Sequence, residues 1–273
     1  MGNLASVALV MAFAAIPFPS AGAETLTMAG TGAATEIARQ LAEAFRRDRA
    51  GIDVQVHNSI GSGGGISAVR TGRLDLGLTI RPLSVEEQAA GLRYVPIGVT
   101  PIVFVVSRRA ENKSSLTVAQ LKAAFEGDLT AWSDGRPLRM ILRADNETSM
   151  VKLIERYPGM AQCLEKARSI RGAIVALNDE EAMRLAVKIP GAVSLGPLST
   201  LVAGAYPLRP LALGDGVIPS VEAVENGTYA LKAEIGFVAP AGARPAAIAF
   251  MDFAASKQGA AILRANGVLP VSR

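Results

Sequence analysis

Apolar and polar positions along the chain change period repeatedly, from the alternation typical of a strand to the spacing typical of a helix. Residues 25–29 and 52–56 have short strand patterns, whereas residues 36–47 place apolar side chains three and four positions apart. The apolar, β-branched run within 94–106 is typical of a buried strand. Because predicted strands and helices alternate along the chain, the pattern predicts an α/β fold.

The same alternation continues through the rest of the chain. Further strands are predicted at 74–78, 139–143, 192–195, 208–213 and 233–238. Further helices are predicted at 66–71, 117–125, 180–188 and 245–266, with another beginning near 148. The chain has no repeat at a solenoid period and no low-complexity linker. A second domain is therefore expected to be inserted into the first rather than appended to it.

The N-terminal segment differs from the rest because residues 1–23 carry no charged side chain. An apolar run at 4–15 is followed by two prolines and the triplet Ala21-Gly22-Ala23, which predicts a secretory signal peptide cleaved after Ala23. The run is shorter than the roughly 20 residues that span a bilayer. No Lys or Arg precedes the run, so the true start codon stays open. We expect a periplasmic protein.

The amino-acid composition excludes several classes of protein and of binding partner. The chain has 273 residues, half of them apolar, and 28 basic against 24 acidic side chains, which excludes a disordered chain and a coiled coil. Its basic residues are scattered and its aromatic residues few, so no nucleic-acid partner is expected. Cys163 is the single cysteine, which excludes an internal disulfide, and it does not follow the cleavage site as a lipid-bearing cysteine would.

Three predicted strand-to-helix junctions share a design that suits a bound anion. They lie at 30–35, at 61–65 and at 143–149. Glycines in the first two let the backbone approach a ligand closely, and a helix N-terminus presents unpaired N–H groups. Each junction alone is also an ordinary tight turn. Together with Arg143 at the third junction, they favour a shared anion site.

Other uses of these junctions fit the residues less well. A dinucleotide fingerprint would need glycine in place of Thr35 and an acidic residue at the end of the next strand, where Asp53 stands too early. A phosphate-binding P-loop would end in Gly-Lys-Ser or Gly-Lys-Thr, which the chain lacks. His57 is the only histidine, so a metal site built on several histidines is excluded. No catalytic residue, metal or cofactor is predicted.

The motifs GTGA at 30–33, SIGSGGGI at 59–66, GRLDLG at 72–77 and RPLS at 81–84 follow one another in the N-terminal half. In this order they resemble the periplasmic phosphate-binding proteins that feed ABC importers. The segment from Leu116 to Gly127 and the C-terminal stretch from Pro219 to Pro270 are also similar to that family. The resemblance covers nearly all of the chain beyond the signal, and GSGGG is its most specific part.

The resemblance implies an α/β, two-lobed class II periplasmic binding protein fold, with a mixed sheet flanked by helices in each lobe and the second lobe inserted in the first. Residues 24–104 and 208–273 would form lobe 1, and residues 105–207 lobe 2. It also implies a monomer, not an enzyme, that carries a tetrahedral oxyanion, inorganic phosphate above all, to ABC permease membrane subunits. The ligand-binding residues implied are Thr31, Gly32, Ala33, Ser62, Gly63, Arg81, Arg143, Thr148 and Ser149.

One departure from the family pattern bears on the choice of ligand. Ile80 stands where well-studied phosphate binders carry an aspartate that accepts the proton of hydrogen phosphate, although Asp145 or Glu147 could take its place. The identity of the oxyanion, the hinge residues and the choice between transport and sensing for a signalling receptor therefore stay open. The alternative from another class is a secreted phosphate-ester hydrolase that uses Asp75 or Ser62.

Overall fold

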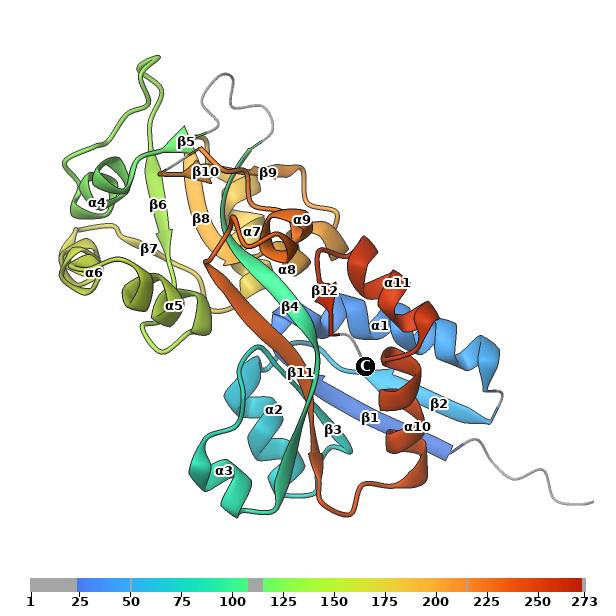
Figure 1. Ribbon diagram of the computed structural model, residues 1–273. Coiled ribbons are helices and arrows are strands. Elements are labelled where there is room, and N and C mark those ends of the chain that lie inside the picture. Colours follow the sequence, from blue (N-terminus) through green and yellow to red (C-terminus); the bar gives the residue numbers. More distant parts are fainter. Residues whose placement is uncertain (1–23, 50, 108–114, 215, 272–273) are drawn as a thin grey trace, which may run out of the picture.

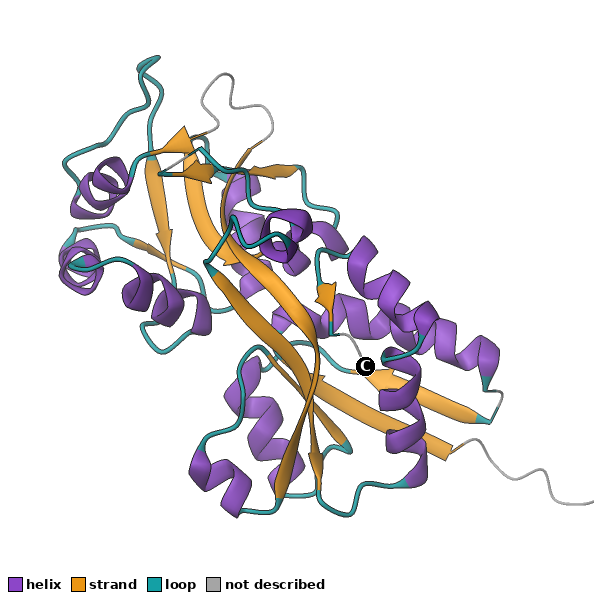
Figure 2. Ribbon diagram, in the orientation of Figure 1, coloured by secondary structure: helices purple, strands orange, loops and turns teal. Residues whose placement is uncertain are grey.

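The protein is described from a computed structural model that covers residues 24–49, 51–107, 115–214 and 216–271 (Figure 1). The predicted signal peptide at 1–23 lies outside the described residues. Helices flank strands on both sides of a long twisted sheet (Figure 2), which confirms the α/β prediction. None of the helices in the described ranges combines the length and the apolar character needed to cross a bilayer.

The first half of the sheet has the strand order β2-β1-β3-β11-β4, with β12 paired to β4. The parallel strands β1, β2 and β3 meet β11, which runs antiparallel to both β3 and β4. These strands are β1 (Glu24–Gly30), β2 (Ile52–Val56), β3 (Leu76–Thr79), β4 (Leu92–Ser107), β11 (Lys232–Pro240) and β12 (Leu269–Pro270).

The second half of the sheet continues from β4 in the order β4-β8-β6-β7, with β9 also on β4. Residues 92–101 of β4 pair with β11, and residues 102–106 pair with β8, so one strand belongs to both halves. A separate short pair joins β5 to β10. The strands are β5 (Ser115–Leu116), β6 (Arg139–Leu142), β7 (Ile174–Val175), β8 (Ala192–Pro197), β9 (Leu208–Pro210) and β10 (Ala212–Leu213).

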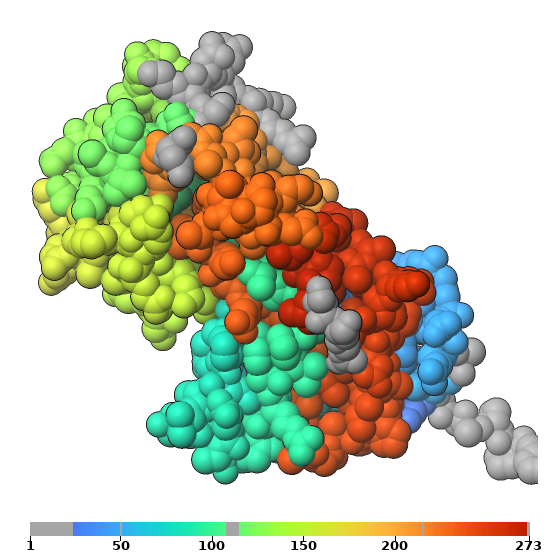
Figure 3. Space-filling model, viewed as in Figure 1, coloured from blue at the N-terminus to red at the C-terminus, as the bar shows by residue number. Residues whose placement is uncertain are grey.

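The helices divide between the two halves of the sheet. Around the first half lie α1 (Gly32–Asp48), α2 (Gly61–Arg70), α3 (Val85–Ala89), α10 (Pro245–Ala254) and α11 (Lys257–Ala265). Around the second half lie α4 (Val118–Glu126), α5 (Thr148–Arg156), α6 (Met160–Ser169), α7 (Asp179–Lys188), α8 (Leu198–Ala203) and α9 (Val221–Glu225). Figure 3 shows a notch between the yellow-green surface around α5 and the cyan surface around α2 and α3.

Apolar side chains on both faces of the first half-sheet hold the helices in place. Phe237 joins the large core shared with α1 and α10, whereas the next residue, Val238, points to a smaller core under α2. Phe45 of α1 makes an edge-to-face contact with Phe250 of α10, with the ring centroids 5.3 Å apart. These contacts hold α1 and α10 on one face of the first half-sheet and α2 on the other.

Most predicted elements are confirmed with bounds shifted by a few residues, and three differences have a structural meaning. Residues 61–65 were predicted as a loop but form the start of α2. The single helix predicted at 245–266 is two helices, because the Ser256 hydroxyl accepts a hydrogen bond from the Gly259 N–H at 3.2 Å and caps the second one. The strand predicted at 208–213 is divided at Leu211 between β9 and β10.

Close packing of α2 on β1 explains why a glycine-rich segment is helical despite poor helix propensity. A Cβ on Gly65 would lie 2.8 Å from the Ala29 carbonyl oxygen and 2.9 Å from the Gly30 Cα, both backbone atoms. A Cβ on Gly63 would meet nothing within 4 Å in the described part of the chain. Of these two residues, Gly65 therefore needs to be glycine for packing and Gly63 does not.

We expect Gly65→Ala to lower the free energy of unfolding by about 1–3 kcal/mol, because backbone atoms must shift to make room for the new methyl group. Gly63→Ala is the matched control and should leave stability unchanged or raise it by up to about 1 kcal/mol, since alanine has the higher helix propensity. Urea denaturation of both variants measures the difference. Equal effects of the two substitutions would contradict this account of α2.

Candidate anion site

A cleft of about 590 Å³ lies where the two halves of the sheet meet. Seven of the nine predicted ligand-binding residues line it: Thr31, Gly32, Ser62, Gly63, Arg81, Arg143 and Thr148. The other two, Ala33 and Ser149, are buried away from it. Segments that are far apart in sequence thus meet in one cavity, as the anion-site prediction requires.

Thr31 and Ser62 each present a hydroxyl whose acceptor side is already used. The Thr31 hydroxyl caps α1 and accepts a hydrogen bond from the Ala33 N–H at 3.3 Å. The Ser62 hydroxyl accepts one from the Ile80 N–H at 3.2 Å. Because each oxygen accepts from the backbone, each O–H hydrogen remains to be donated into the cleft. The Ala33 amide is bonded to Thr31, which explains why Ala33 does not face the cleft.

The N-terminus of α2 adds backbone donors beside Ser62. Its cap residue, Ile60, makes no side-chain capping bond, and the first N–H groups of a helix have no partner within the helix. Gly63 leaves the approach to these groups open, since it carries no side chain. The N-terminal end of the helix dipole also favours a negative charge at this position.

Arg143 supplies the buried positive charge of the cleft. The residue is 4% exposed and follows β6, and its Nη1 donates to Asp179 Oδ1 at 2.6 Å. Its Nε is buried and has no hydrogen-bond partner among the described residues. Burial opposes the charge, but Asp179 and Glu147 outweigh that effect and raise the pKa of Arg143. The guanidinium is therefore charged and retains an unused donor.

Arg81 lines the same cleft, but its guanidinium forms an ion pair with Glu87. Its Nη1 and Nη2 bind the two carboxylate oxygens of Glu87, each at 2.8 Å, which raises the pKa of Arg81 and lowers the pKa of Glu87. This bidentate ion pair joins the segment after β3, which carries Arg81, to Glu87 of α3. Arg81 can contribute long-range charge, whereas Arg143 offers a free N–H.

The third predicted junction is built differently from the first two. Glu147 caps α5, and its Oε2 accepts a hydrogen bond from the Ser149 N–H at 3.0 Å. A carboxylate of the protein therefore occupies the position predicted for an external anion, and the Ser149 amide is used. Burial and the neighbouring charge of Asp179 raise the pKa of Glu147 to about 7.

Of the two carboxyl groups considered as replacements for the aspartate missing at Ile80, only one reaches the cleft. Glu147 lines it, whereas the side chain of Asp145 is 66% exposed and is paired with Arg168. Glu147 is thus the carboxyl group placed to exchange a proton with a bound ligand.

The sequence reasoning missed Asp179, the partner of Arg143. Asp179 begins α7 and lies 36 positions further along the chain. A local signal existed, because Asn178 followed by three acidic residues is a typical helix start. The pattern could not show that one of these carboxylates meets an arginine. In the described ranges, no group of three His, Cys, Asp or Glu residues lies close enough to hold a metal ion.

Comparisons with known proteins agree with this architecture. The PBP superfamily domain matches residues 19–258. The chain is 32% identical over 110 residues to the phosphate-binding protein PstS 2 of Streptococcus agalactiae, a match that spans 40% of this chain and only 36% of that protein. It is 26% identical over 238 residues to protein SphX of Synechococcus elongatus, covering 78% of this chain and 67% of SphX.

A solved structure is also similar in fold. It is a substrate-binding protein assigned to phosphate ABC transport, with bound phosphate, from Clostridium perfringens. The TM-score is 0.78 at 21% sequence identity, over 91% of this chain and 100% of that one. At this identity the likeness shows the arrangement of the elements.

The raised pKa of Glu147 predicts how stability depends on pH. The folded protein holds a proton on Glu147 up to about pH 7, whereas the unfolded chain loses it near 4.5. The free energy of unfolding should therefore fall as pH rises through this window, by at most about 1.4 kcal/mol per pH unit. In Glu147→Gln this pH-dependent part of the free energy of unfolding should vanish.

Glu165→Gln, which alters an exposed carboxyl group on α6, is the control, and in this variant the same pH dependence should persist. Denaturation at pH 4.5 to 8 measures it, and identical profiles for wild type and Glu147→Gln would contradict the assignment.

Proposed function

The chain belongs to the PBP superfamily, and on this premise we propose that it is a periplasmic solute-binding protein that captures inorganic phosphate and delivers it to an ABC-type permease. The observation that carries the proposal is the unpartnered Nε of buried Arg143, in a cleft that Thr31 and Ser62 also line. The names of PstS 2 and of the Clostridium perfringens protein support phosphate as the ligand.

Binding would replace water around the anion by donors of the protein. An unpaired charge in a low-dielectric site costs several kcal/mol, so each phosphate oxygen needs a donor. The hydroxyls of Thr31 and Ser62, the first amides of α2 and Arg143 Nε supply donors from both halves of the sheet. The ligand would then bridge the two halves and favour a closed form over an open one.

The protonation of Glu147 offers a way to distinguish hydrogen phosphate from sulfate. An ionised Glu147 can accept a hydrogen bond from the P–OH group, whereas sulfate has no proton to offer at neutral pH and would be repelled. Glu147 would thus perform the task of the aspartate that Ile80 replaces. Two arginines and two acidic residues line the cleft: Arg81, Arg143, Glu147 and Asp179. Protonation of Glu147 therefore raises the net charge of the cleft by one unit.

The remaining expectations complete the proposal. We retain a monomer that is exported after cleavage behind Ala23, with residues 24–104 and 208–273 as lobe 1 and residues 105–207 as lobe 2. The change of partner along β4, from β11 to β8, supports a lobe boundary near residue 102. The pairings of β9 with β4 and of β10 with β5 associate residues 208–213 with the second half of the molecule, which argues for an end of lobe 2 beyond residue 207.

A hydrolase is less well supported than a binding protein. Asp75 is held by Thr27 and by Arg244 and does not line the cleft, and these hydrogen bonds help to keep the pKa of Asp75 below its usual value although burial opposes them. Ser62 accepts a hydrogen bond from a backbone amide. Within the described ranges, Ser62 makes no hydrogen bond to a general base.

Arg143→Ala should weaken phosphate binding by about 2–5 kcal/mol, or roughly 30- to 5,000-fold, because one partner of a buried charged contact is removed. Ser62→Ala, which removes one hydrogen bond to the charged ligand, should weaken phosphate binding by about 1.5–3 kcal/mol. Arg171→Ala, which alters an exposed arginine on the same half of the molecule, serves as the control. Calorimetry of ligand-stripped protein measures all three, and an isotherm unchanged by Arg143→Ala would remove Arg143 from the site.

Glu147→Gln should bind sulfate at least about tenfold more tightly than the wild type at pH 8, since the repelling charge is gone. Phosphate affinity should change less, so the ratio of phosphate to sulfate affinity should fall. Competition calorimetry with both anions measures this ratio. A ratio that does not change would mean that Glu147 takes no part in the choice between the two anions.

A further inference from the structure

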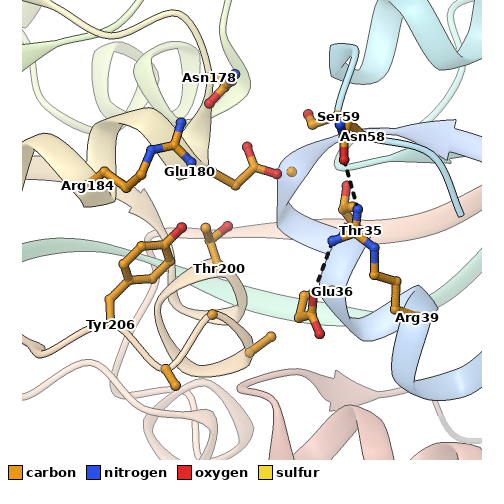
Figure 4. A pocket seen from close by; sticks show the side chains of 14 residues that line it. Thr35, Glu36, Arg39, Asn58, Ser59, Asn178, Glu180, Arg184, Thr200 and Tyr206 are labelled. Carbon is orange, nitrogen blue, oxygen red and sulfur yellow. Dashed lines mark hydrogen bonds and ion pairs between the residues drawn. The ribbon is translucent and has the colours of Figure 1, made fainter. Parts of the chain in front are cut away.

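A second cavity, of about 600 Å³, lies next to the anion cleft between α1 and the α7–α8 region (Figure 4). The two cavities share three lining residues, Gly32, Ser59 and Asn178. A phosphate held in the cleft therefore lies at the entrance of a further space. Inorganic phosphate fills none of that space, and the volume falls within the range of small-molecule sites.

The boundary between the cavities is formed by Gly32 and by the Glu180 side chain. A Cβ on Gly32 would lie 2.5 Å from Glu180 Oε2. The Glu180 carboxyl group can therefore pack against the start of α1 only because residue 32 is glycine. Glu180 belongs to α7 and reaches across to the first half of the molecule. The wall between the two cavities therefore consists of a backbone and one movable carboxyl group.

Two polar atoms of the second cavity are buried without a partner. Thr200 is 5% exposed, and its hydroxyl has no hydrogen-bond partner among the described residues. The same holds for Glu180 Oε2 within the described part of the chain. An unsatisfied buried polar group costs about 1–3 kcal/mol, so ligand hydroxyls that pair with these atoms would gain that energy.

The charges of the second cavity indicate a neutral, polar occupant. Its two arginines and two glutamates balance: Arg39 pairs with Glu36 at 3.1 Å, and Arg184 lies near Glu180. Figure 4 shows the Tyr206 and Thr200 side chains on the wall opposite Thr35 and Arg39. Hydroxyl, phenol and amide groups recognise alcohols, whereas a second anion or an apolar group would find no complementary surface.

We propose that this second cavity binds the hydroxylated organic part of a small phosphate monoester whose phosphate group occupies the anion cleft. The inference rests on the proposed phosphate-binding function. In the complex, one ligand hydroxyl donates to Glu180 Oε2 and another bonds with the Thr200 hydroxyl. The ester tail enters past Gly32, and the Glu180 side chain rotates to admit it.

The test compares sn-glycerol 3-phosphate, inorganic phosphate and phenyl phosphate by calorimetry on ligand-stripped protein. Glycerol 3-phosphate is expected to bind with an affinity within about tenfold of that of inorganic phosphate and to compete with it, and phenyl phosphate to bind more weakly. If inorganic phosphate binds and glycerol 3-phosphate does not compete, the subsite is overturned while the proposed function stands. If neither binds, the proposed function itself fails.

One variant tests the position of the tail. Thr200→Val should weaken glycerol 3-phosphate binding by at least about fivefold, the effect of one lost hydrogen bond, and leave inorganic phosphate binding unchanged. The unchanged phosphate isotherm also shows that the variant is folded. Equal effects on both ligands, or no effect on either, would overturn the assignment of the tail to this cavity.

Discussion

The burial of the Arg143 guanidinium is the constraint on which the rest of the cleft depends. A charge removed from water must be paired, and Asp179 meets this need with a contact of 2.6 Å. The contact with Asp179 uses Nη1 of the guanidinium and leaves Nε without a hydrogen-bond partner among the described residues. It also places Asp179 near Glu147, which caps the adjacent helix, and burial together with this neighbouring charge raises the pKa of Glu147 to about 7. The positive charge and the group that titrates are thus two consequences of one packing arrangement.

The two halves of the molecule contribute different chemistry to the cleft. The first half supplies uncharged donors: the hydroxyls of Thr31 and Ser62, which backbone hydrogen bonds hold in place, and the amides at the start of α2, which have no partner within the helix. The second half supplies Arg143, Asp179 and Glu147. Because β4 runs through both halves, one strand joins them directly. A tetrahedral anion that needs donors on several sides is best solvated when both halves approach it.

Local sequence patterns were sufficient for the α/β class, for most elements and for seven residues that line the cleft. These features depend on short-range periodicity and on glycines at strand-to-helix junctions, which a single sequence displays. Asp179 was missed because its pairing with Arg143 is a long-range contact that no spacing reveals. Ser149 does not line the cleft, and its amide is used because a neighbouring carboxylate, Glu147, caps its helix. The helical start of α2 was missed because four glycines in five residues argue for a loop, while close packing on β1 decides otherwise.

A crystal structure of the protein grown with phosphate at neutral pH tests the central claim most directly. The account predicts a single phosphate in the cleft, with hydrogen bonds from the Thr31 and Ser62 hydroxyls and from Arg143 Nε, and with Arg143 still bound to Asp179. A phosphate bound elsewhere, or one in the cleft that leaves Arg143 Nε without a partner, would contradict it.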